Sequence, residues 1–114
     1  MNTKNKGSLE FYVYKEKSGD YCAICLTLNL IEWGKDPKKL MNSINEAAIS
    51  HIVGVIKKGL SDELLNRPAP DKYWLMARKN LLPAVEKPNK KESTKTNFFS
   101  FESKPYNHGS FITA

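Results

Sequence analysis

The chain has 114 residues, a net charge of +6 and 40% hydrophobic residues, a composition that suits one domain with a single core. No apolar run approaches the ~20 residues of a membrane span, and the first residues lack an apolar signal segment. The 2 cysteines cannot build the disulfide framework of a small secreted domain. We therefore expect a soluble, cytoplasmic protein with no membrane contact.

Hydrophobic residues are unevenly distributed. Residues 9–82 contain 36 of them in 74 positions, whereas residues 83–114 contain 9 in 32. This predicts a globular domain over 9–82 and a polar, basic linker over 83–97. It also predicts an aromatic tail over 98–114 that forms either a strand or a partner-binding segment. The charge is uneven too, because the second half from Arg67 onward contributes +5.

Two apolar segments on either side of Gly19 predict a β-hairpin. Residues 9–14 and the stretch that begins at Tyr21 alternate in character, and Ser18-Gly19 fits a two-residue turn. This turn places large aliphatic residues together on one face, in the pairs Val13 with Ile24, Phe11 with Leu26, and Leu9 with Leu28. Tyr12 and Tyr14 then lie on the other face, where we expect them to be exposed.

A strand and a long helix are predicted to follow. Residues 30–34 form the strand, and Asp36-Pro37 begins the helix, because the carboxylate can cap free amides and proline has no amide to leave unpaired. Apolar residues recur at helical spacing until Lys57-Lys58 and Gly59 end the helix. The predicted fold class is α+β: a three- to four-stranded, mainly antiparallel sheet with one long helix packed on one face.

The segments after the helix are less regular. Residues 61–65 fit a single helical turn, and the prolines of residues 67–70 predict an extended chain. Residues 72–79 fit either a last strand or a short helix, because so short a segment has no decisive periodicity.

Few residues point to catalysis or metal binding. Cys22 and Cys25 form a C-x-x-C motif, but on a strand they point to opposite faces and cannot bind one metal. His51 lies at the edge of the apolar helix stripe, where packing explains it better than catalysis. We therefore expect that the protein is not an enzyme and that it binds no cofactor and no metal. A small hydrolase that uses His51 or His108 is the least favoured alternative.

Aromatic and basic residues are the remaining candidates for function. They could stack on bases and follow phosphates, or they could pack on the sheet or on another subunit. We favour a protein contact, because protein interfaces are enriched in such aromatic residues. The candidate partner-binding residues are Tyr12, Tyr14, Trp33, Trp74, Arg78, Phe98, Phe99 and Phe101.

Four short motifs follow one another in the chain: Tyr21-x-Ala23, Leu28-x-Leu30, Gly34-x-Asp36 and Glu46-Ala47. In this order they resemble the HicB-like antitoxins, whose strand–strand–strand–helix domain is similar to part of an RNase H fold. The resemblance covers about residues 9–70. It implies a non-enzymatic antitoxin that forms a homodimer and binds a HicA-like toxin, a small RNA-cleaving protein.

The family's usual C-terminal DNA-binding module has no counterpart in the sequence, because residues 83–114 contain no pair of amphipathic helices. The alternative function is a stand-alone nucleic-acid-binding protein that uses the basic C-terminal half.

Overall fold

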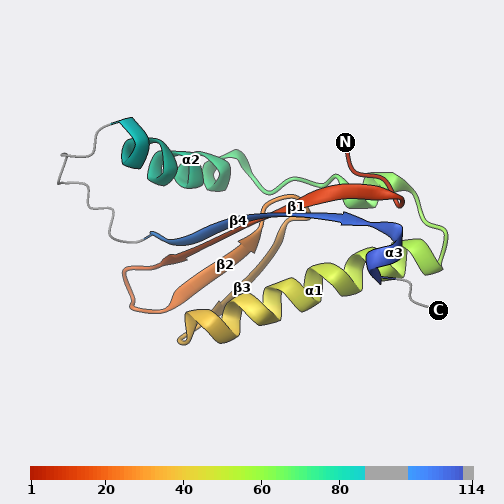
Figure 1. Ribbon diagram of the computed structural model, residues 1–114. Helices are drawn as coiled ribbons and strands as arrows, with labels where there is room; N and C mark the ends of the chain where they lie inside the picture. The colour runs from red at the N-terminus through yellow and green to blue at the C-terminus, as the bar shows by residue number, and fades with distance from the viewer. Residues whose placement is uncertain (87–97, 112–114) are drawn as a thin grey trace.

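The fold is a four-stranded antiparallel sheet with helices on both faces (Figure 1). The computed structural model describes the backbone of residues 1–86 and 98–111, and the side chains of residues 1–79 and 99–109. The elements, in chain order, are β1 (Lys6–Lys15), β2 (Tyr21–Cys25), β3 (Leu30–Gly34), α1 (Pro37–Lys57), the 3₁₀ helix η1 (Asp62–Leu65), α2 (Asp71–Glu86), β4 (Phe98–Asn107) and α3 (His108–Phe111). The expected α+β class is confirmed.

The hairpin of β1 and β2 forms as predicted, but its predicted register is wrong by one residue. The observed pairs are Phe11 with Cys25, Tyr12 with Ile24, Val13 with Ala23, and Tyr14 with Cys22. The reason is the length of the loop. The Glu16 amide donates to the Asp20 carbonyl (2.8 Å) and the Gly19 amide to the Glu16 carbonyl (2.9 Å), so the loop has three residues. Gly19 closes it with a φ of 101°, a conformation that glycine adopts without strain.

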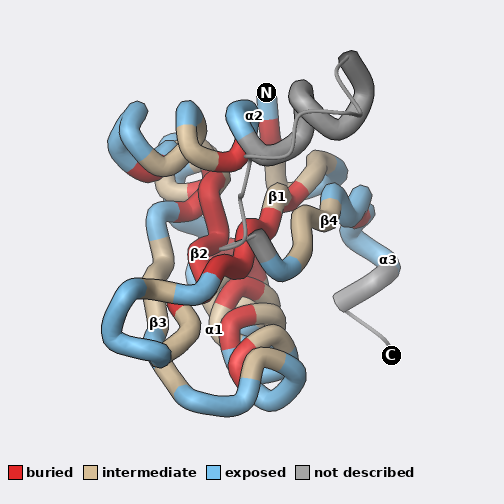
Figure 2. Tube along the Cα trace, turned by 90° about the vertical axis from the view of Figure 1, so that its left-hand side faces the viewer, coloured by how far each residue is buried: buried red, intermediate tan, exposed pale blue. Residues whose placement is uncertain are grey.

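Both faces of the sheet are buried, which is why alternation alone could not fix the register. On one face Phe11 and Val13 pack against Ile44 and Ile52 of α1. On the other face Tyr12 joins the side chains beneath α2. Figure 2 shows the buried residues concentrated along β1 and β2, between the two helices.

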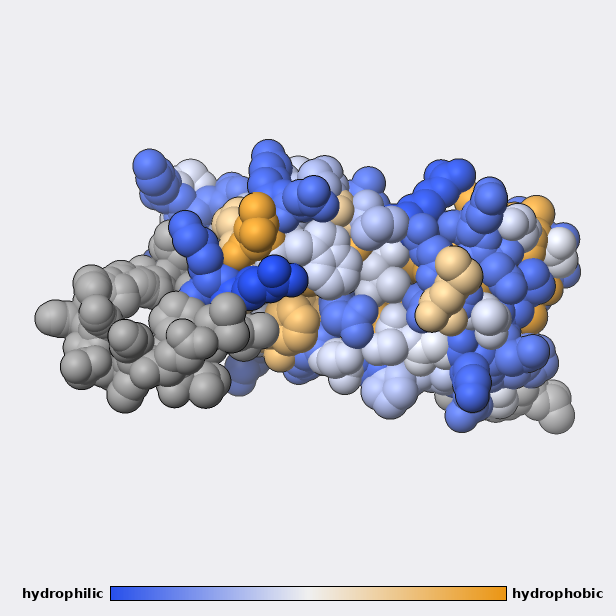
Figure 3. All heavy atoms as spheres, turned by 90° about the horizontal axis from the view of Figure 1, so that it is seen from above, coloured by the Kyte–Doolittle hydropathy of each residue, from blue (hydrophilic) through white to orange (hydrophobic). Residues whose placement is uncertain are grey.

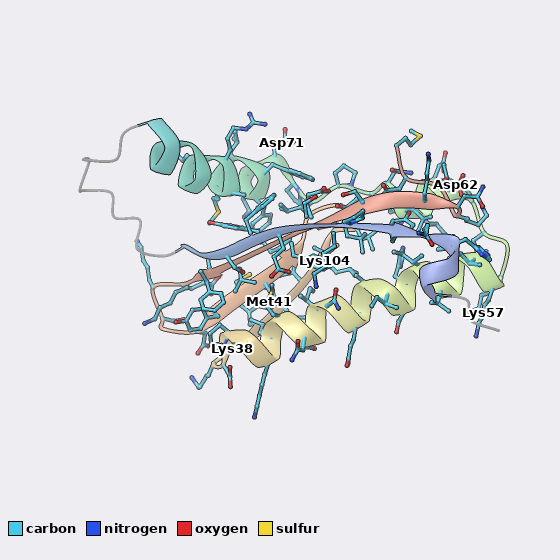
Figure 4. All side chains as sticks on the ribbon, in the orientation of Figure 1. Lys38, Met41, Lys57, Asp62, Asp71 and Lys104 are labelled. Carbon is cyan, nitrogen blue, oxygen red and sulfur yellow. The ribbon has the colours of Figure 1, made fainter. Side chains whose placement is uncertain are left out.

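The long helix α1 begins and ends where the sequence predicts. The Asp36 carboxylate accepts the amides of Lys38 (3.0 Å) and Lys39 (3.3 Å), which caps the first turn. Gly59, with a φ of 62°, follows the last turn. Lys38 and Lys57 mark the two ends of the helix along the sheet (Figure 4).

The second half of the chain completes the fold. Residues 72–79, which fitted either a strand or a helix, lie in α2, and this helix continues to Glu86. The last part of the range expected as a linker, 87–97, lies outside the described residues. β4 pairs with β1 from Lys6–Asn107 to Tyr14–Phe98, with a bulge at the Phe98 end. Residues 98–107 therefore belong to the same sheet as the N-terminal hairpin.

The N-terminal segment is fastened beside η1. Asn2, only 7% exposed, accepts the Ser8 amide (2.9 Å) and donates to the Leu65 carbonyl (3.0 Å). The Tyr106 hydroxyl donates to the Thr3 carbonyl (2.9 Å). Because these contacts join residues far apart in the chain, they hold the first residues, η1 and β4 together.

Candidate partner-binding surface

Trp33 is the predicted contact residue that projects most clearly from the sheet. Its side chain is 57% exposed, although it belongs to a strand. It pairs with Cys22 and therefore lies on the face that α2 covers, beyond the reach of that helix. A large aromatic side chain left half in solvent is a candidate anchor for a partner.

Glu16 connects Trp33 to Tyr14. The Trp33 Nε1–H and the Tyr14 hydroxyl both donate to Glu16 Oε2, each at a distance of 3.3 Å. Burial, and to a lesser extent a hydrogen bond with Cys22, raises the pKa of Tyr14 above its ordinary value, so the phenol stays a neutral donor. No sequence motif marks Glu16, although its two-residue spacing from Tyr14 places both side chains on one side of an extended chain.

An open groove of about 420 Å³ lies between the hairpin and α2. Its lining residues are Tyr14, Lys15, Glu16, Lys17, Ser18 and Met76. Lys15 and Lys17 are exposed, so cations flank the carboxylate of Glu16.

The expectation that Tyr12 and Tyr14 are exposed is wrong. Tyr12 is 0% and Tyr14 8% exposed, because α2 covers this face of the sheet. The two rings stack with centroids 5.3 Å apart. Of the two, Tyr14 lines the groove, whereas Tyr12 lies in the core.

The predicted residues on α2 have separate environments. Trp74 is partly buried and its Nε1–H donates to the Ala69 carbonyl (3.1 Å), which secures the start of the helix. Arg78 is exposed on the outer side of the helix. The structure therefore does not bring Trp74 and Arg78 into one site with Trp33.

The phenylalanines of β4 diverge at its bulge. Phe101 is partly buried and packs beneath α2. Phe99 is 39% exposed and meets Tyr21 edge to face at 5.8 Å, on the α1 side. The irregularity explains this divergence, since a bulge disturbs the alternation of side chains. Phe98 pairs with Tyr14 through its backbone, and its side chain is not among those that the structure describes.

The cysteines and histidines occupy structural positions. Cys22 lies beneath α2 and Cys25 beneath α1, so the prediction that they point to opposite faces is confirmed. Burial raises the pKa of the Cys22 thiol and raises that of Cys25 to about 11. His51 Nε2 lies 2.6 Å from the Leu64 carbonyl oxygen, and the His108 amide donates to the Asn5 carbonyl (2.7 Å). Across residues 1–79 and 99–109, no three potential metal ligands gather into a site.

Comparisons with known proteins add no relative: no family model, no curated protein and no solved structure matches the chain. Within the described part of the chain, every helix is too short or too polar to cross a membrane.

Proposed function

We propose that the chain is a non-enzymatic HicB-like antitoxin, or a related regulatory domain, that binds a small toxin-like ribonuclease. In this proposal it acts in the cytoplasm as a homodimer and neutralises the ribonuclease by occluding it.

The positions of the motif residues support this proposal. Tyr21 and Ala23 lie on β2, Gly34 and Asp36 lie where β3 leads into α1, and Glu46 lies on α1. Leu30 begins β3. The motif residues therefore follow a strand–strand–strand–helix order, which is the order that the resemblance implies.

The observation that carries the proposal is the exposure of Trp33 beside an open groove. Tryptophan is enriched among the residues that contribute most to protein binding, because it removes a large area from water at little cost in conformational entropy. Lys15 and Lys17 give the groove a polar rim, which is typical of an interface centred on an aromatic anchor.

The test is co-expression with a small ribonuclease encoded beside the chain, followed by co-purification and an RNA-cleavage assay. Trp33→Ala should weaken binding by about 2 kcal/mol, or roughly thirtyfold. Leu60→Ala is the matched control, because Leu60 is another exposed apolar residue (39%) and follows α1 at the end remote from the hairpin. Failure of the unaltered chain to bind or inhibit the ribonuclease would contradict the proposal.

A second candidate function, nucleic-acid binding through the basic C-terminal half, is favoured by the outer side of α2. Lys72, Arg78 and Lys79 are exposed there. Figure 3 looks onto this side and shows a mainly hydrophilic surface with small apolar patches. If this side binds phosphates, the affinity should fall steeply with salt, and the double variant Arg78→Gln, Lys79→Gln should reduce that salt dependence.

A further inference from the structure

The two edges of the sheet differ in how they are protected. The sheet order β3-β2-β1-β4 leaves β3 and β4 at the edges. β4 has a bulge, a proline at position 105 and an ion pair between Lys104 and Glu102 (3.5 Å), all of which hinder further strand pairing. β3 has neither a bulge nor a proline, and it forms the outer flank of the sheet in Figure 2.

The hydrogen-bonding groups of β3 that face outward can be identified. The Glu16 amide donates to the Asp20 carbonyl, so Asp20 belongs to a hydrogen-bonded pair with β1. Hydrogen-bonded and non-hydrogen-bonded pairs alternate along an antiparallel ladder, so the even-numbered residues of β2 bond to β1 and the odd-numbered residues bond to β3. Ile31 and Trp33 oppose even-numbered residues of β2, so their amides and carbonyls point away from the sheet. Nothing in the described part of the chain bonds to these four groups.

The side chains of β3 set the chemistry of a fifth strand. Ile31 and Trp33 lie on the α2 face, where Ile31 is partly buried and Trp33 is exposed. Glu32 lies on the α1 face, and its Oε1 accepts the Ser43 hydroxyl (2.6 Å). The other oxygen of Glu32 is not used by that bond. A strand on this edge therefore faces an apolar pair on one side and a carboxylate on the other.

A second copy of the chain fits this edge poorly. A symmetric antiparallel pairing that uses all four free groups places Ile31 of each copy opposite Trp33 of the other. The same pairing brings the two Glu32 side chains directly opposite each other, and like charges at such a position are destabilising. A positively charged residue at that position would instead meet Glu32 favourably.

We propose that β3 accepts an extended strand of another protein, in which a lysine or arginine lies opposite Glu32 and apolar residues lie opposite Ile31 and Trp33. This inference deepens the proposed function and rests on it for the identity of the partner, since the small ribonuclease would supply the strand. Main-chain bonds give such a contact its affinity, and the alternating side chains give it specificity.

Amide hydrogen exchange of the complex with the ribonuclease tests the geometry. The amides of Ile31 and Trp33 should exchange at least about tenfold more slowly in the complex, because each gains a hydrogen bond. The amide of Lys58, which bonds to the Gly54 carbonyl at the end of α1 remote from the hairpin, serves as the control and should be unaffected. A complex that forms while Ile31 and Trp33 exchange as before would overturn the strand pairing and leave the proposed function intact.

Synthetic peptides test the edge without the ribonuclease. Blocked pentapeptides with lysine or glutamate between two valines are titrated against the labelled full chain at millimolar concentration. The lysine peptide should shift the Ile31 and Trp33 amides and bind about fivefold more tightly than the glutamate peptide. Glu32→Lys should reverse this preference, whereas Glu46→Lys, an equal charge change on the exposed side of α1, should not.

Three outcomes would overturn the inference: equal affinity for both peptides, no shift with either peptide, or protection of Ile31 and Trp33 in a dimer of the chain alone. The last would assign the edge to a second copy. If the lysine peptide binds as expected but no ribonuclease does, the edge stands and the proposed partner fails.

Discussion

Gly7 occupies a position on β1 that has no room for a methyl group. A Cβ added there would collide with Asn2 Oδ1 and would lie 2.6 Å from the Tyr106 hydroxyl oxygen. We expect Gly7→Ala to lower the free energy of unfolding by about 1–3 kcal/mol, because the N-terminal contacts must shift. Urea denaturation at constant m-value would measure the change.

The matched control is Gly54→Ala. An added Cβ meets nothing within 4 Å there, and the residue lies inside α1. Alanine is the better helix former, so this variant should gain about 0.5–1 kcal/mol. Changes of the same sign in both variants would contradict the packing argument.

The Cys25 thiol predicts a loss of stability at high pH. Burial raises its pKa from 9.0 to about 11 in the folded protein. The unfolded chain therefore releases this proton first, and the free energy of unfolding should fall as the pH rises from 9.0 towards about 11. Urea titrations over this range would show the fall, and it should be shallower in Cys25→Ala; an identical slope would exclude a contribution from this thiol.

At the scale of single elements, the ends of α1 were predictable because each depends on neighbours in the sequence. Asp36 caps amides only two and three residues away, and Gly59 directly follows the last turn. The hairpin register depends instead on the loop length and on which face is buried. Both faces are buried here, because α2, from the second half of the chain, covers the face that contains Tyr12. The hairpin sequence alone does not indicate this cover, which is why Tyr12 was expected to be exposed.

The cap of α1 gives a prediction at this scale. Asp36→Ala should cost about 0.5–2 kcal/mol, since two amides of the first turn lose their acceptor. Asp36→Asn keeps a side-chain oxygen and should retain most of the stability. Thermal unfolding of both variants measures the difference, and equal losses would show that the charge matters more than the cap.

The candidate site was only partly predictable for a related reason. The sequence predicted the short strand that contains Trp33 and its choice as a contact residue, whereas the position of that strand at the sheet edge comes from the structure. The role of Glu16 and the outward-facing groups of Ile31 depend on the exact loop and register, which the sequence left open. Features that depend on neighbouring residues could therefore be predicted from the sequence, whereas the register between strands could not.

At the scale of the whole molecule, β4 is an integral strand. It pairs along the length of β1, and Tyr106 of β4 is 7% exposed within the α1-side core. A chain that ends at residue 97 should therefore lose its cooperative thermal transition, as measured by circular dichroism. Adding a peptide of residues 98–111 should restore part of it; an unchanged transition in the shortened chain would contradict this role.

The position of β1 between β2 and β4 also has a consequence for synthesis. β1 meets its hairpin partner almost at once, but its other side waits for residues 98–107. At typical translation rates that wait is on the order of ten seconds, during which a growing chain presents an open β edge on the ribosome. Early aggregation and chaperone capture should therefore concentrate on the strand that ends up at the centre of the sheet.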